Sequence, residues 1–170
     1  FTDWLPALLG ITDTQRLTGM PLDGGDVLPL LRGESPADAP RRFWQWNAYS
    51  PVGTSNAAMR DGPWKLVRPQ LDLRPATAAA RALMARYVEQ DIAYKRDPCG
   101  VTLMTDAEPE RIIGEPPPPE LYHIRDDPGE VEDLAAAYPE RASHMLTELE
   151  SWFEQVEAER RVIAAQNVAS

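Results

Sequence analysis

Asn56-Ala-Ala-Met-Arg-Asp-Gly-Pro-Trp-Lys-Leu-Val-Arg68 contains two short strand candidates on either side of a turn signal. Glycine adopts a positive φ at no steric cost, so Asp61-Gly62 predicts a β-hairpin. Pro63 cannot donate to a strand ladder, which suits the first residue of the returning strand. We therefore expect strands at 56–60 and 64–68, joined as a hairpin.

Two more strands are expected, at 42–47 and at 120–124. The first is rich in aromatic residues and partly alternating, and the second follows a run of prolines at 116–119 that must be extended. Asp126-Asp-Pro-Gly129 then predicts a turn. In it the aspartates bond to nearby backbone, the proline has a fixed φ and the glycine leaves its own φ free.

A long terminal helix is predicted at 139–165, which begins on a proline and contains no other proline or glycine. Burying its apolar side on the sheet would contribute on the order of ten kcal/mol before the entropy cost, at about 1.5–3 kcal/mol per large side chain. Glu157 is expected to pair with Arg161, one helical turn further on. The apolar stripe has helical spacing and comprises Ala142, Met145, Leu146, Leu149, Trp152, Phe153 and Val156.

Short helices are predicted near the N-terminus, at 2–10 and 26–32. Thr2 or Asp3 can cap the first and Asp26 the second, because an oxygen-bearing side chain accepts from the free N–H groups of a first turn. Gly10 is placed to end the first helix, and a loop is expected at 12–25. Gly33 is placed to end the second helix, and a loop is expected at 34–40.

Residues 69–119 are the least regular part of the chain. Within them, 76–95 has good helix formers and neither proline nor glycine, which predicts a helix. After Asp97-Pro98 the composition becomes linker-like. The apolar face expected for this helix comprises Ala79, Leu83, Met84, Tyr87, Val88 and Ile92.

The composition fits one domain over 1–170, with 43% hydrophobic residues to build a core. A net charge of −10 argues against a nucleic-acid partner, and only two lysines leave no polybasic patch for a membrane. The elements together predict the α+β class. We expect a small antiparallel sheet of about four strands with a long C-terminal helix packed on it, short N-terminal helices and a partly helical insertion at 69–119.

A nucleophile and a zinc site are the first chemical candidates to weigh. A catalytic cysteine needs a nearby base, whereas Cys99 lies in a loop beside Asp97. His123 falls on a predicted strand and His144 on the terminal helix, and a lone pair of histidines does not supply the three or four ligands of a zinc site. We expect neither group to be functional.

The acidic candidates have structural explanations as well. Asp23 and Asp26 surround Gly24-Gly25, but the ligand spacing of a calcium loop is absent, and helix capping accounts for Asp26. The pair Asp126-Asp127 could be two catalytic carboxylates, yet the proline and glycine that follow favour a turn. The residues therefore identify no catalytic, cofactor-binding or metal-binding position.

Three tryptophans, Trp44, Trp46 and Trp64, could form a surface for stacking sugars or part of the core. Aromatic side chains on a sheet more often pack under a helix. We expect at least two of the three to lie in the core, against Trp152 and Phe153 of the terminal helix.

Five segments of this sequence, in this order, carry a family resemblance. They are Phe1-Thr-Asp-Trp-Leu-Pro-Ala-Leu-Leu-Gly-Ile11, Pro21-Leu-Asp-Gly-Gly-Asp-Val-Leu-Pro-Leu-Leu-Arg-Gly33, Arg42-Phe-Trp-Gln-Trp46, Ala58-Met-Arg-Asp-Gly-Pro-Trp-Lys-Leu-Val67, and Glu120-Leu-Tyr-His-Ile-Arg-Asp-Asp-Pro-Gly-Glu130 continued by Val131-Glu-Asp-Leu-Ala135. Together they resemble the C-terminal subdomain of sulfatases, in the alkaline-phosphatase superfamily. Residues 69–119 match nothing in that pattern, which marks them as an insertion.

The resemblance implies that the chemistry lies on another part of the protein. Sulfatases hydrolyse sulfate esters or sulfamates with a formylglycine, made from the cysteine of a Cys-x-Pro/Ala-x-Arg motif, beside a calcium ion. Here Cys99 is followed by Gly100-Val-Thr-Leu103, which lacks that motif, and Lys65 belongs to the hairpin and does not match the catalytic lysine. Formylglycine and calcium are thus expected on a missing N-terminal catalytic domain. This chain alone is expected to be inactive, completing the fold and contributing to one wall of the substrate pocket.

That catalytic domain is the partner which the resemblance implies, and the apolar start at Phe1 without an initiator methionine agrees with a fragment. Two alternatives stay open: the tail of a related phosphonate or phosphodiester hydrolase, and a stand-alone acidic module that binds a protein or a glycan. The substrate stays open too, as does a cytoplasmic or periplasmic location. Apolar residues expected to be exposed, and to promote self-association, are Leu5, Leu8, Leu9, Leu28 and Leu31.

Overall fold

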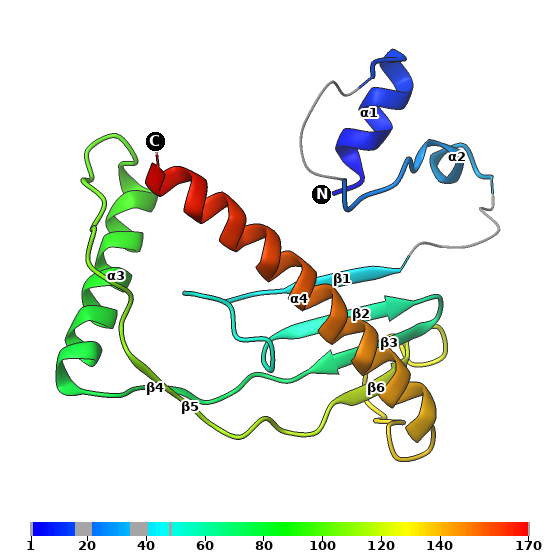
Figure 1. Ribbon diagram of the computed structural model, residues 1–170. Coiled ribbons are helices and arrows are strands. Elements are labelled where there is room, and N and C mark those ends of the chain that lie inside the picture. The colour runs from blue at the N-terminus through cyan, green and yellow to red at the C-terminus, as the bar shows by residue number, and fades with distance from the viewer. Residues whose placement is uncertain (1, 16–21, 35–40, 48, 170) are drawn as a thin grey trace. The chain divides into compact units, whose positions relative to one another are not determined.

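The computed structural model confirms the predicted α+β class (Figure 1). No helix in the part of the chain that the structure describes is long and apolar enough to cross a bilayer. Parts of the loops predicted at 12–25 and 34–40 lie outside the described residues, which are 2–15, 22–34, 41–47 and 49–169.

The chain forms two compact units, 1–42 and 43–170. The first contains helices α1 (Trp4–Thr12) and α2 (Leu28–Leu31). Asp3 precedes α1, but its carboxylate does not cap the helix. It accepts hydrogen bonds from the Gly25 N–H at 3.0 Å and from Arg42 Nη2 at 2.7 Å, so it links the start of α1 to two later segments of this unit.

Two details predicted for these helices are wrong. α1 continues through Gly10 to Thr12, and its C-cap is Asp13, whose φ of 50° is left-handed. The residue that caps α2 is Val27, not Asp26. The Asp26 carboxylate still accepts a hydrogen bond from the first N–H of α2, at 2.9 Å, so it stabilises this turn from one position earlier.

The second unit is built on a four-stranded antiparallel sheet with the order β1-β2-β3-β6. In the register, Arg60 faces Lys65 across the β2–β3 pair and Leu66 faces Leu121 across the β3–β6 pair. The predicted hairpin is therefore confirmed. The strands are β1 (Arg42–Gln45), β2 (Ala57–Asp61), β3 (Trp64–Arg68) and β6 (Glu120–His123).

The hairpin turn is formed by Gly62 and Pro63, because Asp61 and Trp64 are the last paired residues. Gly62 has a φ of 56°, which a side chain would disfavour. Pro63 thus lies in the turn, and the returning strand begins at Trp64 as predicted. Its carbonyl accepts the Ile124 N–H at 2.8 Å, which holds the end of β6 beside the turn.

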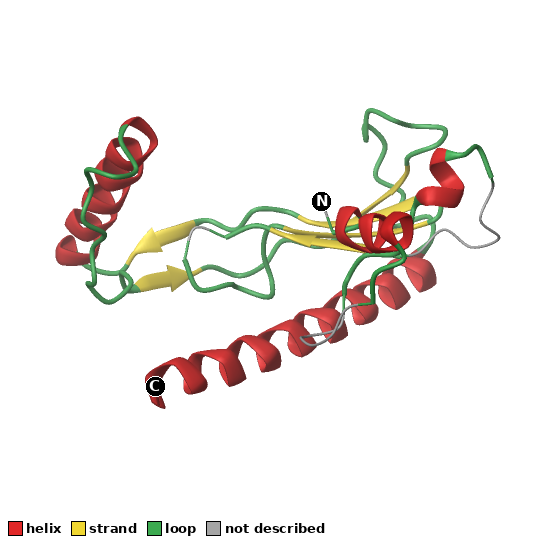
Figure 2. Cartoon of the chain, turned by 90° about the horizontal axis from the view of Figure 1, so that it is seen from above, coloured by secondary structure: helices red, strands yellow, loops and turns green. Residues whose placement is uncertain are grey.

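The core lies between this sheet and the terminal helix α4 (Pro139–Ala169), which runs across one sheet face (Figures 1 and 2). Alternate strand residues point toward the helix, and helix residues at i, i+3 and i+7 meet them. The fully buried members are Met59, Leu66, Leu121, Met145 and Leu149, with Ala57 and Ala142 beside them.

The stripe predicted for this helix is confirmed up to Phe153 and wrong beyond it. Val156 is exposed, whereas Glu157 is buried. Glu157 pairs with Arg160 and not with the predicted Arg161: two hydrogen bonds of 2.8 and 2.7 Å join the carboxylate to the guanidinium. The last buried position of this face is therefore 157 and not the predicted 156, and the carboxylate buried there is paired with a guanidinium.

Residues 69–119 form an excursion between β3 and β6. Two short strands, β4 (Leu73–Pro75) and β5 (Arg111–Ile113), pair antiparallel in a second sheet, and α3 (Ala78–Arg96) lies between them in sequence. The helix was predicted, and Thr77 caps it by accepting the Ala80 N–H at 3.0 Å. The two strands were not predicted.

The apolar face predicted for α3 is partly wrong. Ala80 is the buried residue of this helix, and Leu83, Met84 and Tyr87 are half-buried on the same side. Three residues of the predicted stripe, Ala79, Val88 and Ile92, are exposed. α3 thus stands mostly in solvent, and its exposed apolar side chains are available for other contacts.

Candidate functional site

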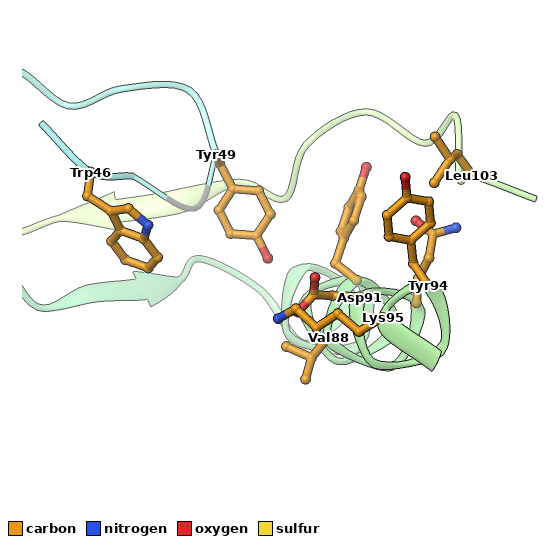
Figure 3. Close-up of a pocket in the computed structure, with 9 residues that line it drawn as sticks. Trp46, Tyr49, Val88, Asp91, Tyr94, Lys95 and Leu103 are labelled. Atoms are coloured by element: carbon orange, nitrogen blue, oxygen red, sulfur yellow. The ribbon is translucent and has the colours of Figure 1, made fainter. Parts of the chain in front are cut away.

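A cavity of about 640 Å³ lies between the end of β1 and α3 (Figure 3). We call it the aromatic cleft, because four aromatic side chains line it. Trp46 and Tyr49 come from the segment after β1, and Tyr87 and Tyr94 come from α3. The remaining lining residues are Val88, Gln90, Asp91, Lys95 and Leu103.

Regular structure places these aromatic residues. The Trp46 N–H donates to the Asn56 carbonyl at 3.0 Å, which holds the chain beside β2 as β1 ends. Tyr87 and Tyr94 are seven residues apart on α3 and so lie on one side of the helix, two turns apart. Trp46 keeps 70% of its surface exposed, so its ring is free for a ligand.

The segment that returns from α3 to β5 closes another side of the cleft. The Tyr87 hydroxyl donates to the Asp106 carbonyl and Gln90 Nε2 donates to the Thr102 carbonyl, both at 2.8 Å. Arg86 reaches both carboxylate oxygens of Asp106 at 3.3 Å. These bonds hold Leu103 beside α3, so the wall does not depend on buried apolar contacts.

Tyr49 lies at the centre of this arrangement. Its ring meets that of Tyr87 edge to face at 5.7 Å, and the Arg111 guanidinium lies 5.2 Å from the ring centre. Burial raises the pKa of Tyr49, and the neighbouring Tyr87 raises it further by a smaller amount. Its phenol therefore stays protonated at neutral pH and can donate a hydrogen bond.

Acidic and basic groups around the cleft neutralise one another. Lys95 Nζ lies 2.6 Å from the Asp91 carboxylate, one turn earlier on α3. Arg111 Nη2 lies 3.7 Å from the carboxylate of Glu108, and the Ser50 N–H, by donating to that carboxylate, lowers the pKa of Glu108. Such pairing leaves no excess positive charge to attract an anion.

The prediction for the three strand tryptophans is wrong. Trp64 packs against the core, where its ring contacts Tyr138 at 5.0 Å and the Arg141 guanidinium at 4.9 Å. Trp44 and Trp46 are exposed. Strand alternation explains the outcome, because it turns Phe43 toward the helix, where it stacks on Trp152 at 5.3 Å, and turns Trp44 the other way.

The structure places Cys99 in an exposed turn after α3. Its N–H and that of Gly100 donate to the Asp97 carboxylate at 3.2 and 3.1 Å, so this acidic residue shapes the turn. His144 is exposed on α4, 3.6 Å from Glu148. None of these contacts joins the thiol to a base.

His123 and the two turn aspartates are close together. His123 Nδ1 lies 2.7 Å from the Asp126 carboxylate, and its ring meets Trp64 edge to face. The Asp127 carboxylate accepts the N–H groups of Val131 and Glu132 at 2.7 and 2.9 Å, as an Asx turn does. Within the described ranges, no three His, Cys, Asp or Glu side chains, Asp23 and Asp26 included, gather as metal ligands would.

The positive φ in this turn falls on an unexpected residue. Gly129 was predicted to use its conformational freedom here, but the left-handed residue is Glu130, with a φ of 53°. Lys65 Nζ lies 2.6 Å from both of its carboxylate oxygens. A half-buried ion pair thus holds Glu130 in a conformation that side chains rarely adopt.

Comparison with known proteins adds no family assignment: no protein-family model matches the chain, and no curated protein matches it significantly.

Proposed function

We propose that this chain is the C-terminal subdomain of a sulfatase, or of a closely related hydrolase of the alkaline-phosphatase superfamily. In that role it completes the fold of the enzyme and contributes to one wall of the substrate pocket. The observation that carries the proposal is the architecture of the second unit. The segments that resemble the family form β2, β3, β6 and the turn after it, and α4 packs across them.

Contacts between the resembling segments support this proposal. Lys65, from the hairpin segment, pairs with Glu130, from the segment that follows β6. The Asp133 carboxylate accepts the N–H groups of Leu121 and Ala135, each at 2.9 Å, and so links β6 to the chain that leads into α4. These residue types therefore have a structural reason to recur together in a subdomain that carries no chemistry.

The described residues do not fit the cofactors of the family. No cluster of three carboxylates or other ligands exists among them for calcium, and Cys99 lacks the flanking residues that formylglycine formation needs. The proposal accordingly assigns both groups to a catalytic domain outside this chain. That domain is also the proposed partner.

The apolar surface of the first unit supports such a partner. Leu5, Leu8 and Leu31 are 48%, 52% and 65% exposed, while Leu9 and Leu28 are half-buried. Leucines exposed on two neighbouring helices cost free energy in water, and a docked domain would cover them. The chain by itself is expected to self-associate through these leucines. Sedimentation velocity would measure this self-association in the chain and in a triple variant with Leu5→Ser, Leu8→Ser and Leu31→Ser.

The decisive test is the coding sequence upstream of Phe1 together with an assay of the whole gene product. We expect a Cys-x-Pro/Ala-x-Arg motif on the order of several hundred residues upstream. The product should hydrolyse para-nitrophenyl sulfate, lose this turnover when the motif cysteine is replaced by alanine, and keep it in Cys99→Ala. A start codon directly before Phe1, or turnover that depends on Cys99, would contradict the proposal.

The ester type is the second thing that this assay decides. Related phosphonate and phosphodiester hydrolases share parts of this C-terminal pattern, so the same product is tested on para-nitrophenyl phenylphosphonate and bis-para-nitrophenyl phosphate. Faster turnover of either would move the assignment to that branch. A stand-alone acidic binding module remains the alternative if the upstream motif is absent.

A further inference from the structure

A second cavity adjoins the aromatic cleft and shares Trp46 and Tyr49 with it. Its volume is about 330 Å³, and polar side chains line most of the remaining wall, among them Asn47, Asp72 and Arg111. The two hollows therefore offer one aromatic region and one polar region that share the same two rings.

Two buried nitrogen donors in this polar wall have no partner among the described residues. Arg111, whose side chain is 9% exposed, donates from Nη2 to the Ser50 carbonyl at 3.1 Å, but its Nη1 bonds to nothing described. Asn47 Oδ1 accepts the Val52 N–H at 3.3 Å, which fixes the amide and leaves Nδ2 without an acceptor. Buried donors without acceptors are rare in folded proteins, because leaving them unpaired costs free energy.

The chemistry of this wall favours a ligand with many neutral hydroxyl groups. Arg111 Nη1 and Asn47 Nδ2 are donors that need acceptors. The Asp72 carboxylate and the Gln70 side-chain carbonyl, on the same wall, can accept hydrogen bonds. A hydroxyl group both donates and accepts, and it carries no charge. The acidic residues near the cleft and its mutually paired cations would not favour a sulfated or phosphorylated ligand.

We propose that the aromatic cleft and its polar neighbour form a binding site for a neutral saccharide. One sugar ring lies on the exposed face of Trp46 beside Tyr49, and its hydroxyl oxygens accept hydrogen bonds from Arg111 Nη1 and Asn47 Nδ2. Further sugar units extend along Tyr87 and Tyr94 of α3. The site lies on the excursion and on the segment that follows β1, and it does not depend on the sulfatase assignment.

Binding to the full chain is measured with maltotriose, cellotriose, chitotriose and mannotriose as neutral probes and a sulfated heparin disaccharide as the anionic probe. Saturation-transfer NMR identifies the probe that binds, and calorimetry gives its affinity. We expect one or more neutral probes to bind and the sulfated one to bind more weakly. No binding of any neutral probe, or preference for the sulfated one, overturns the proposal.

Substitutions locate the site. Trp46→Ala should weaken binding about tenfold or more, whereas Trp44→Ala, an exposed tryptophan outside both cavities, should leave the affinity unchanged. Asn47→Asp keeps the acceptor for the Val52 N–H and removes the free donor, so it should bind at least about tenfold more weakly with an unchanged melting temperature. Equal effects of Trp44→Ala and Trp46→Ala, or full affinity in Asn47→Asp, would contradict the assignment.

Discussion

The sheet with α4 and the excursion at 69–119 are held together by different forces. In the first, apolar side chains from three strands and one helix are fully buried against one another. In the second, Leu71, Ala80 and Pro109 are the buried residues that the structure describes, and hydrogen bonds such as those of Tyr87 and Gln90 fix the returning segment. One region is stabilised mainly by burial and the other mainly by polar contacts at its surface, which suits a scaffold and a binding wall respectively.

The largest expected effect is loss of stability when the apolar core is cut. Leu66 is fully buried between its strand neighbours and α4, so Leu66→Ala should lower the free energy of unfolding by about 3 kcal/mol. Leu103→Ala, in the excursion, removes the same atoms from a residue that is 62% exposed and should change it by less than about 0.5 kcal/mol. Urea unfolding of both variants gives the comparison, and equal losses would mean that the excursion is packed as tightly as the core.

Next in size is the ion pair that supports the sheet. Lys65→Met should lower the free energy of unfolding by about 1 kcal/mol. Lys65 Nζ bonds to both carboxylate oxygens of Glu130, which is half-buried and held at a positive φ. Arg86→Met, which breaks the exposed pair with Asp106, should cost less than about 0.5 kcal/mol. Glu130→Gln, alone and combined with Lys65→Met, completes a double-mutant cycle for the Lys65–Glu130 pair. A coupling energy near zero would show that the pair does not hold the turn.

A smaller, pH-dependent effect is expected where α4 extends beyond the sheet. The hydrogen bonds from Arg160 lower the pKa of Glu157. Because the folded-state pKa lies below the unfolded one, the stabilisation is present above about pH 4.3 and is lost as the pH falls through the lowered value. Thermal unfolding from about pH 6 to about pH 3 should therefore show a shallower acid loss in Glu157→Gln than in the wild type.

Glu154→Gln is the control, because it removes one negative charge from an exposed position of the same helix. Its acid profile shows how much of the difference comes from the change in net charge alone. If both variants follow the wild-type acid profile, the Glu157–Arg160 pair adds nothing to stability.

The smallest effect on the core is expected from removing most of the excursion. The Ala76 N–H donates to the Glu110 carbonyl at 2.9 Å, beside the paired strands β4 and β5, so replacing 77–109 by Asn-Gly should close a short hairpin. The variant should unfold within about 1 kcal/mol of the wild type. It also lacks α3 and should bind none of the neutral saccharides. Loss of the folded sheet would show that the two regions are not separable.

The sequence predicted the core well because its signals are local. Asp61-Gly62 identifies the hairpin, and the spacing of Met145 and Leu149 identifies the buried side of α4, without knowledge of the rest of the chain. Details that depend on neighbours were missed. The pattern could not show that Arg160 would hold Glu157 in a buried position, or that Lys65 would hold Glu130 at a positive φ.

The excursion and its cleft were harder to predict for the same reason. β4 and β5 have three residues each, so neither is long enough to show the alternation that identifies a strand. They pair with each other although α3 separates them in the sequence. The cleft combines Tyr49 with residues of α3 that only the folded chain brings together. One available signal was the seven-residue spacing of Tyr87 and Tyr94, which places two tyrosines on one side of a helix.

The pairing of Val67 with Glu120 in the β3–β6 register has a consequence for how such a chain can change over time. The two residues are direct neighbours across the ladder, so any polypeptide that connects them departs and returns at the same end of the sheet. The entropy cost of closing a loop grows only slowly with its length. New sequence can therefore be gained, lost or exchanged at this junction while β3 and β6 remain paired, and a ligand preference can diverge there without a new core having to evolve.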